Sequence, residues 1–187
     1  MPLPSGLDYA TPYEIMVGVW DGLASVFDPD QHFVGSWPSR VVIYWKEPGK
    51  LLCFQQAQQD QPISMFDRAD DKSEDLAERR EHLRKMAALT RYHVDFHING
   101  KRGYGKQGDM TYTGLETTPG VYLFHIKTPD GSFYNNQFFT DPNERHIIGP
   151  FVKAPGNELT QVLSQTFRRI SYNVPEDLKE RHRERPA

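Results

Sequence analysis

The chain has 187 residues, 37% of them hydrophobic and 25% charged, with a formal net charge of −3. This composition is typical of a globular protein and excludes a disordered one. The 22 basic residues are outnumbered by 25 acidic residues, so no basic excess can neutralise phosphates, and we expect no nucleic-acid partner. Because Cys53 is the only cysteine, neither an internal disulfide nor a cysteine-based zinc site can form.

Residues 1–8 contain no basic segment followed by an apolar stretch, so no secretory signal is recognised there. No apolar run approaches the roughly 20 residues that a transmembrane helix needs. We therefore expect a cytoplasmic protein with no membrane partner.

The first part of the chain predicts strands separated by turns. Residues 1–12 carry three prolines and form an arm, and residues 13–17 predict a short helical turn. The predicted strands are 19–27, 32–37 leading through Pro38 into 40–46, and 51–56. Each run is bounded by turn residues, as β-hairpins require.

One helix is predicted at about residues 73–89. Ser73 can cap its first turn, and two acidic residues follow where the helix dipole favours them. Leu76, Leu83 and Ala87 form a thin apolar stripe on an otherwise charged helix. The pattern indicates a helix that lies on the surface or over an opening, either as a solvated helix docked by a few leucines or as a mobile lid.

After the helix, strands are predicted at 91–98, 110–116, 121–127, 132–140 and 146–153. Residues 161–172 predict a last strand, or a helix ending in one, and residues 173–187 form a charged tail that is helical or frayed. Asn99-Gly100 is a strong hairpin signal because both residues tolerate positive φ. The whole chain therefore predicts a single, mainly β domain: an antiparallel up-and-down barrel of eight to ten strands over residues 13–172, with one inserted helix.

The segment Gly18-Val19-Trp20, at the entry to the first strand, resembles the Gly-x-Trp signature of the lipocalin and calycin barrels. The resemblance implies that Trp20 closes the barrel floor and packs against an arginine of the last strand, either Arg168 or Arg169. Cytosolic proteins of this calycin-like superfamily include phycobilin lyases, nitrobindin-like haem proteins and small barrel decarboxylases or cyclases. The resemblance does not place the chain in one of these groups.

His93, Asp95 and His97 share one face of a predicted strand, because strand side chains alternate. They could transfer protons, with Asp95 fixing a histidine tautomer, or supply two ligands to a metal whose third ligand comes from elsewhere. Alternatively this face lies in water and the apolar face of the strand points inward, which the strand pattern itself favours. The density of titratable groups leads us to predict that the three side chains point into the pocket and are catalytic.

A second candidate wall combines amides with aromatic rings. Asn135 and Gln137 share a strand face with Phe133 and Phe139, which is typical of a pocket wall that orients a ligand, or of cross-strand amide hydrogen bonds. The predicted ligand-binding residues are Tyr44, Phe54, Tyr112, Phe124, Asn135 and Gln137. Residues 103–108 match Gly-x-Gly-x-x-Gly, but no βαβ unit surrounds them, so we expect a flexible loop at the barrel mouth.

These features predict a cofactor-independent enzyme of the lyase, isomerase, cyclase or decarboxylase type, acting on a small hydrophobic or aromatic substrate. The alternative is a non-catalytic binding or chromophore-handling protein for a tetrapyrrole, terpenoid or similar ligand. A third hypothesis is an interaction module that uses the charged helix. We predict no cofactor and no bound metal, a small hydrophobic molecule as partner, and we leave a homodimer open.

Overall fold

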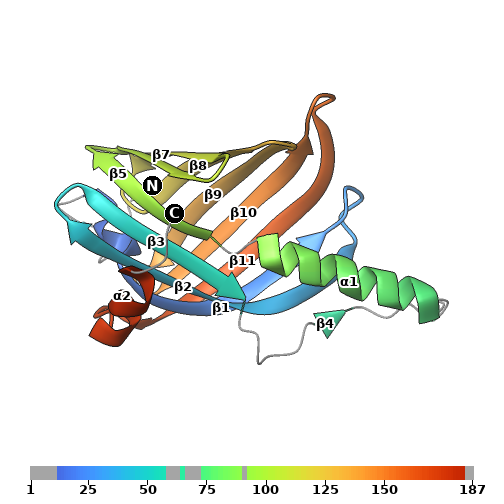
Figure 1. Cartoon of the computed structure of the whole chain (residues 1–187), viewed down its shortest axis with the longest axis horizontal. Coiled ribbons are helices and arrows are strands. Elements are labelled where there is room, and N and C mark those ends of the chain that lie inside the picture. Colours follow the sequence, from blue (N-terminus) through green and yellow to red (C-terminus); the bar gives the residue numbers. More distant parts are fainter. Residues whose placement is uncertain (1–11, 58–63, 66–72, 90–91, 184–187) are drawn as a thin grey trace.

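The computed structural model describes residues 12–57, 64–65, 73–89 and 92–183. Its elements, in chain order, are η1 (Glu14–Met16), β1 (Gly18–Phe27), β2 (Phe33–Glu47), β3 (Lys50–Ala57), β4 (Ser64–Met65), α1 (Ser73–Leu89), β5 (Tyr92–Asn99), β6 (Arg102–Gln107), β7 (Met110–Thr118), β8 (Val121–Thr128), β9 (Gly131–Asp141), β10 (Glu144–Lys153), β11 (Glu158–Ser171) and α2 (Glu176–Arg183) (Figure 1). Of the predicted N-terminal arm, residues 1–11 lie outside the described part of the chain.

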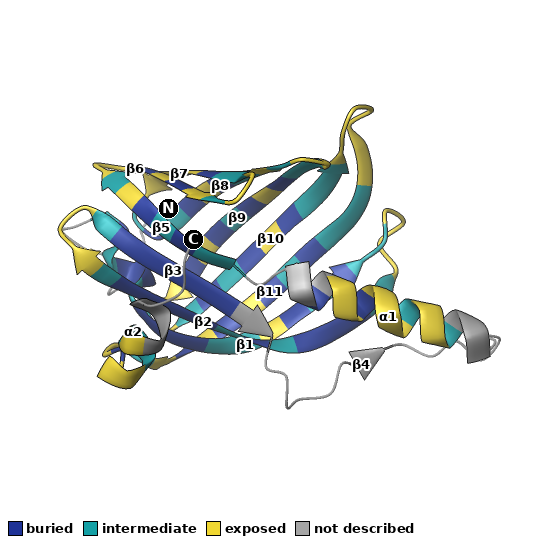
Figure 2. Ribbon diagram, viewed as in Figure 1, coloured by how far each residue is buried: buried dark blue, intermediate teal, exposed yellow. Residues whose placement is uncertain are grey.

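The strands form one antiparallel sheet that closes on itself. β1 pairs with β11 on one side and with β2 on the other, so ten strands make a barrel, while the two-residue β4 pairs only with the start of β2. Neighbours in the barrel follow chain order, which confirms the predicted up-and-down topology of a mainly β, calycin-like barrel (Figure 1). Buried and exposed residues alternate along strands such as β9 and β10, as a filled barrel requires (Figure 2).

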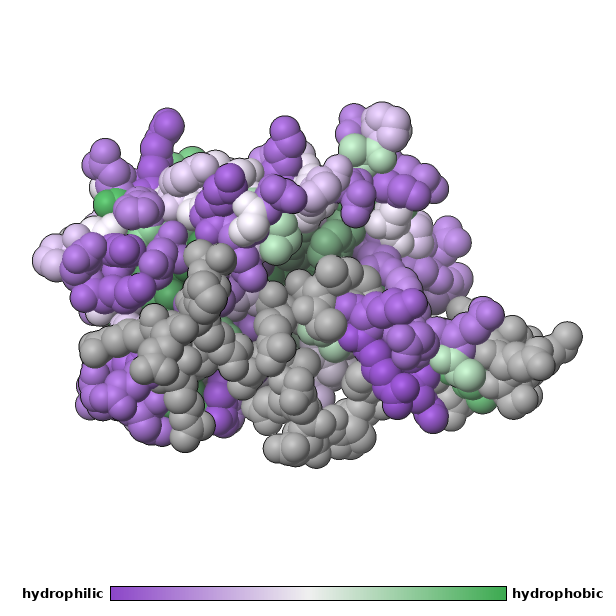
Figure 3. Space-filling model, in the orientation of Figure 1, coloured by the Kyte–Doolittle hydropathy of each residue, from purple (hydrophilic) through white to green (hydrophobic). Residues whose placement is uncertain are grey.

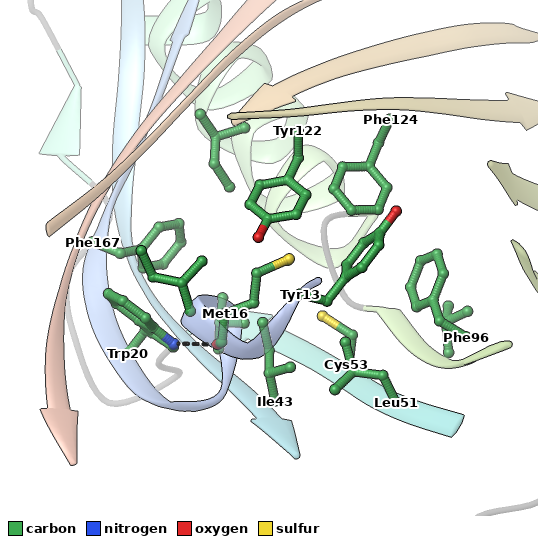
Figure 4. Packing of buried hydrophobic residues seen from close by; sticks show 14 of the residues in the cluster. Tyr13, Met16, Trp20, Ile43, Leu51, Cys53, Phe96, Tyr122, Phe124 and Phe167 are labelled. Atoms are coloured by element: carbon green, nitrogen blue, oxygen red, sulfur yellow. Dashed lines mark hydrogen bonds between the residues drawn. The ribbon is translucent and has the colours of Figure 1, made fainter. Parts of the chain in front are cut away.

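One end of the barrel is closed by η1 and Trp20. The predicted short helical turn is confirmed as η1, and the indole Nε1 of the fully buried Trp20 donates to the Met16 carbonyl at 2.9 Å (Figure 4). The Arg169 guanidinium of β11 lies 4.1 Å from the Trp20 ring centroid and donates to carbonyls of η1 and of the β9–β10 turn. The predicted contact between Trp20 and an arginine of residues 168–169 is therefore confirmed.

Tyr13 extends from η1 into the barrel, where its ring lies among Phe124, Phe96 and Cys53 (Figure 4). Glycine is needed on the strands that face it: a Cβ at Gly114 would lie 3.0 Å from the Tyr13 hydroxyl and even closer to the Phe124 ring. The prediction of a flexible loop over residues 103–108 is wrong, because residues 102–107 form strand β6. Of its glycines, Gly103 leaves room for the Tyr13 hydroxyl, and Gly105 leaves room for Val94 of β5.

Two α-helices flank the barrel within the described residues. α1 confirms the helix predicted at 73–89: Leu83 and Ala87 are buried against apolar side chains of β1, β2, β9 and β11. Figure 3 shows that most of the visible surface of α1 is hydrophilic. α2 places Leu178 against the outer face of β1–β3 and makes the first part of the charged tail helical. Neither described helix combines the length and the apolar composition needed to cross a membrane.

Candidate functional site

The barrel interior holds a small cavity of about 30 Å³. It is lined by Tyr13, Met16, Leu51, Cys53, Tyr92, Phe96, Tyr112, Phe124, Ile126, Asn135 and Gln137. These residues come from η1 and the residue before it and from the five strands β3, β5, β7, β8 and β9, and most of their surface is apolar or aromatic. A cavity of this size holds about one water molecule, so a larger ligand has to displace the Tyr13 ring or its neighbours.

Asn135 and Gln137 form a polar wall of this cavity. Both are buried on the inward face of β9 with Phe133 and Phe139, as the sequence predicts. The Gln137 Nε2 donates to Asn135 Oδ1 at 2.8 Å, whereas the buried Gln137 Oε1 accepts no hydrogen bond from the described residues. An unpaired amide oxygen is costly in an apolar interior, and a ligand donor could satisfy it.

Three weak acids, on β3, β5 and β7, also line the cavity, and all of them are neutral at physiological pH. The Cys53 thiol lies 3.6 Å from the Tyr92 hydroxyl, and burial raises the pKa of Cys53 to about 11. Burial also raises the pKa of Tyr92 well above its usual value and that of Tyr112 to about 12. These groups can donate hydrogen bonds, but they do not supply a base near neutral pH.

Arg145 is the most unusual side chain of the interior. It is fully buried, and Nε, Nη1 and Nη2 all lack a hydrogen-bond partner among the described residues. Its guanidinium carbon lies 5.0 Å from the Trp20 ring centroid and 4.9 Å from that of Phe167. Burial lowers the pKa of Arg145, and the acidic groups that oppose this shift are the Tyr92 hydroxyl and the Cys53 thiol, with no carboxylate among them.

The two aromatic contacts do not compensate for this burial. A desolvated cation–π contact contributes about 2 kcal/mol, whereas removing a cation from water without a counter-charge costs several kcal/mol, and each unpaired N–H adds to that cost. The Arg145 guanidinium therefore lacks the counter-charge and the hydrogen-bond acceptors that would offset the cost of its burial.

Two further polar atoms on the inner face of the barrel are buried and unpaired. Trp37 Nε1 and Gln165 Nε2 are buried and donate no hydrogen bond within the described residues. The strand register places the three donors on the inner face in two adjacent rows, each of which consists of residues paired across the strands β2, β1, β11, β10 and β9. The first row is Trp37, Ala24, Gln165, Ile147 and Gln137, and the second is Ser39, Gly22, Phe167, Arg145 and Phe139. We refer to Trp37 Nε1, Gln165 Nε2 and the Arg145 guanidinium as the donor cluster.

The three predicted catalytic residues lie outside the barrel. Asp95 forms ion pairs with Lys46 at 3.0 Å and Lys50 at 3.7 Å, and His97 is exposed. The His93 ring packs against Phe54 on the outer face. The prediction that His93, Asp95 and His97 point into the pocket is wrong, because the apolar residues of β5 occupy its inward face. Those residues are Tyr92, Val94, Phe96 and Ile98.

The six predicted ligand-binding residues divide into two groups. Tyr112, Phe124, Asn135 and Gln137 line the cavity. Tyr44 and Phe54 do not, because they lie on the outer face of β2 and β3, packed with Val174 and Leu178. The expectation that these two face the ligand pocket is therefore wrong.

Comparisons with known proteins agree on the fold. A scan against protein-family models and a search of curated proteins gave no match. Among solved structures, the S-type phycobiliprotein lyase CPES from Guillardia theta matches with a TM-score of 0.55 and 9% identity, over 84% of this chain and 89% of that chain. Rv2717c from M. tuberculosis matches with a TM-score of 0.50 and 13% identity, over 90% and 99% of the two chains. The protein therefore has the fold of a calycin-like barrel.

A protein of unknown function from the DUF3598 family of Nostoc punctiforme has a TM-score of 0.57 and 12% identity over 86% of this chain. This chain spans only 49% of that protein's length. At these identities the likeness establishes the fold, in agreement with the resemblance predicted from Gly18-Val19-Trp20, and it assigns no activity.

Proposed function

We propose that the barrel interior binds a small, largely apolar ligand. The observation that carries this proposal is the cavity lined by Tyr112, Phe124 and the amide pair Asn135 and Gln137, in which the Gln137 oxygen is unpaired within the described structure. Apolar walls with a few oriented polar groups are the usual composition of a small-molecule site. Tetrapyrroles, terpenoids and similar hydrophobic molecules remain the proposed ligand classes.

Binding without catalysis is the function that this geometry supports best. The His and Asp residues on which acid–base chemistry was predicted lie on the outer surface, and the cavity's own weak acids keep their protons at neutral pH. An acid–base pair must reach the substrate, which these outer residues do not.

Catalysis of the predicted lyase, isomerase, cyclase or decarboxylase type is the second candidate, and one observation favours it. The buried Glu116 carboxylate accepts a hydrogen bond from the Tyr122 hydroxyl at 3.0 Å inside the barrel. One protein of this fold carries the name of a lyase, so the fold is compatible with an enzyme. Turnover that is lost in Glu116→Gln would favour this candidate.

A neutral fluorescent probe tests the proposed binding function. We expect N-phenyl-1-naphthylamine to gain fluorescence on binding, and Ile126→Trp to weaken its binding about tenfold or more, because the larger ring fills the cavity that Ile126 lines. Leu123→Trp is the matched control, since Leu123 is exposed on the outer face of the same strand. Circular dichroism checks that both variants fold. A probe that does not bind, or that binds both variants as it binds the original protein, would contradict the proposal.

We further propose a cytoplasmic location, action without a cofactor or metal, and no partnership with nucleic acid or membranes. A homodimer is likewise an open proposal, which sedimentation analysis can test. An absorption spectrum of the purified protein would reveal a bound visible chromophore, which would favour the chromophore-handling alternative.

A further inference from the structure

We infer that the ligand of this barrel carries a carboxylate, which lies against the Arg145 guanidinium and accepts hydrogen bonds from the donor cluster. The inference rests on the proposed binding function and adds the chemical class of the ligand's polar group.

The donor cluster contains donors and no acceptor. Arg145 offers up to five N–H groups, Gln165 offers its amide Nε2 and Trp37 its indole Nε1. A neutral polar ligand would leave the positive charge uncompensated, whereas an anion satisfies both the charge and the open hydrogen bonds. The chemistry of the cluster therefore selects an anionic group.

The single positive charge of Arg145 favours an anion with one negative charge. Only Arg145 in the donor cluster is charged, and its guanidinium is planar and forked, which matches the two oxygens of a carboxylate. A phosphate dianion would leave one negative charge unpaired in the same apolar surroundings. A carboxylate of one negative charge balances the site.

The inner face beside Gly22 is closely packed, because a Cβ there would lie 2.6 Å from the Phe167 ring. A ligand group therefore has to reach Arg145 from the cavity. The cluster adjoins the cavity: Tyr92 and Cys53, which line it, are the groups that interact electrostatically with Arg145. A carboxylate at Arg145 can thus be joined to an apolar body in the cavity.

The two apolar clusters of the interior would contact the rest of such a molecule once it displaces side chains around the cavity. One contains Trp20, Phe124 and their neighbours at the closed end, and the other contains Trp37, Phe133 and Leu163 beneath Leu83 of α1. The donor cluster lies between them, since Trp37 belongs to the second cluster and Arg145 contacts Trp20 of the first. An amphipathic acid with one polar end and an apolar body fits this distribution.

The inference can be tested with dodecanoate and dodecanol, which have the same chain length and differ only in their polar group. Each is added to the full-length protein loaded with N-phenyl-1-naphthylamine, and displacement gives its affinity. We expect dodecanoate to bind at least about tenfold more tightly than dodecanol, the worth of a charged hydrogen-bonded contact. Arg145→Met should remove this preference and still bind the neutral probe. Arg168→Met, which replaces an exposed arginine of β11, should retain it.

The outcomes separate this inference from the proposed function. If the original protein binds the probe but shows equal affinity for dodecanoate and dodecanol, the carboxylate assignment is overturned. The proposed binding function then still stands. If the probe does not bind, the interior does not take this neutral aromatic ligand, and thermal unfolding with each additive decides the inference: a Tm raised by dodecanoate alone supports it, and no rise overturns it. If Arg145→Met does not fold, Gln165→Leu serves as the second variant and should lower the preference for the acid severalfold.

Discussion

Arg169 joins three segments of the chain through one side chain. Its guanidinium donates to the Ile15 carbonyl at 2.7 Å, to the Val17 carbonyl and to the Pro142 carbonyl at 2.7 Å, while stacking on Trp20. Those carbonyls belong to η1, to the residue after it and to the β9–β10 turn. The closed end of the barrel therefore depends on the forked geometry of an arginine.

Replacing Arg169 by lysine should destabilise the protein by about 2–3 kcal/mol. A lysine keeps the charge but cannot satisfy several diverging carbonyls at once, so buried acceptors lose their partners. The free energy of unfolding measured with urea checks this value. Arg168→Lys, at the exposed neighbouring position, should change stability by less than about 0.5 kcal/mol. Equal effects of the two substitutions would refute the role given to Arg169.

At the residue scale, the sequence identified some interior residues and missed the most informative one. Trp20 could be found from its three-residue motif, and Asn135 and Gln137 from their shared face with phenylalanines. Arg145 could not, because an arginine just after a turn is normally exposed and only the register with Phe139 and Phe167 places it inside.

The orientation of β5 shows why a strand pattern can be interpreted in two ways. Its alternation separates the titratable residues from the apolar ones but does not say which set faces inward. The packing of Val94 and Phe96 with the closed-end residues determines the answer, because burying apolar rings gains free energy whereas burying Asp95 would lose its two lysine partners. A titratable cluster alone is therefore weak evidence for a site.

At the scale of elements, helix and strand positions were largely predictable. The helix at 73–89 has the predicted bounds, and the predicted runs 32–37 and 40–46 form the single strand β2, which continues through Pro38. Pro38 is tolerated because β3 pairs with β2 only from Ser39 onward and β4 pairs no further than Ser36, so no partner on that side needs its missing N–H.

α1 is attached to the barrel through few described apolar side chains, and Leu83 is the larger of the buried two. Leu83→Ala should cost about 2 kcal/mol of local stability, at the lower end for a buried leucine, and so raise local opening of α1 roughly thirtyfold. Hydrogen exchange should accelerate in α1 and stay unchanged in the barrel strands. Lys85→Ala, at an exposed position of the same helix, is the control. If exchange accelerates equally in the strands and in α1, the helix does not open as a separate unit.

For the whole molecule, closure of the sheet is what makes the interior dry. The count and order of strands could be predicted from turn signals, and closure followed because a long open meander would leave unpaired edges. What the interior contains depends on register across five strands, which no single strand encodes. The protonation behaviour of the whole barrel follows from that dry interior.

Buried tyrosines make the stability of the barrel sensitive to alkaline pH. Burial raises the pKa of Tyr13, Tyr92, Tyr112 and Tyr122 above the usual value of 10.0. A phenol is neutral when protonated, so the folded state retains protons that the unfolded chain releases. The resulting stability is fully present below pH 10 and is lost as the pH rises through the raised folded-state pKa values.

The contribution of Tyr112 to this loss of stability can be tested, because the pKa of Tyr112 rises from 10.0 to about 12. A shift of that size corresponds to about 3 kcal/mol of stability lost between pH 10 and pH 12. Tyr112→Phe removes one of the four titrating tyrosines and should make the decline in unfolding free energy over this range less steep, measured with urea at successive pH values. Tyr134→Phe, which replaces an exposed tyrosine, should leave the decline unchanged. If Tyr112→Phe and the original protein lose stability with the same slope, the Tyr112 hydroxyl titrates freely in the folded state and the interior around it is open to water.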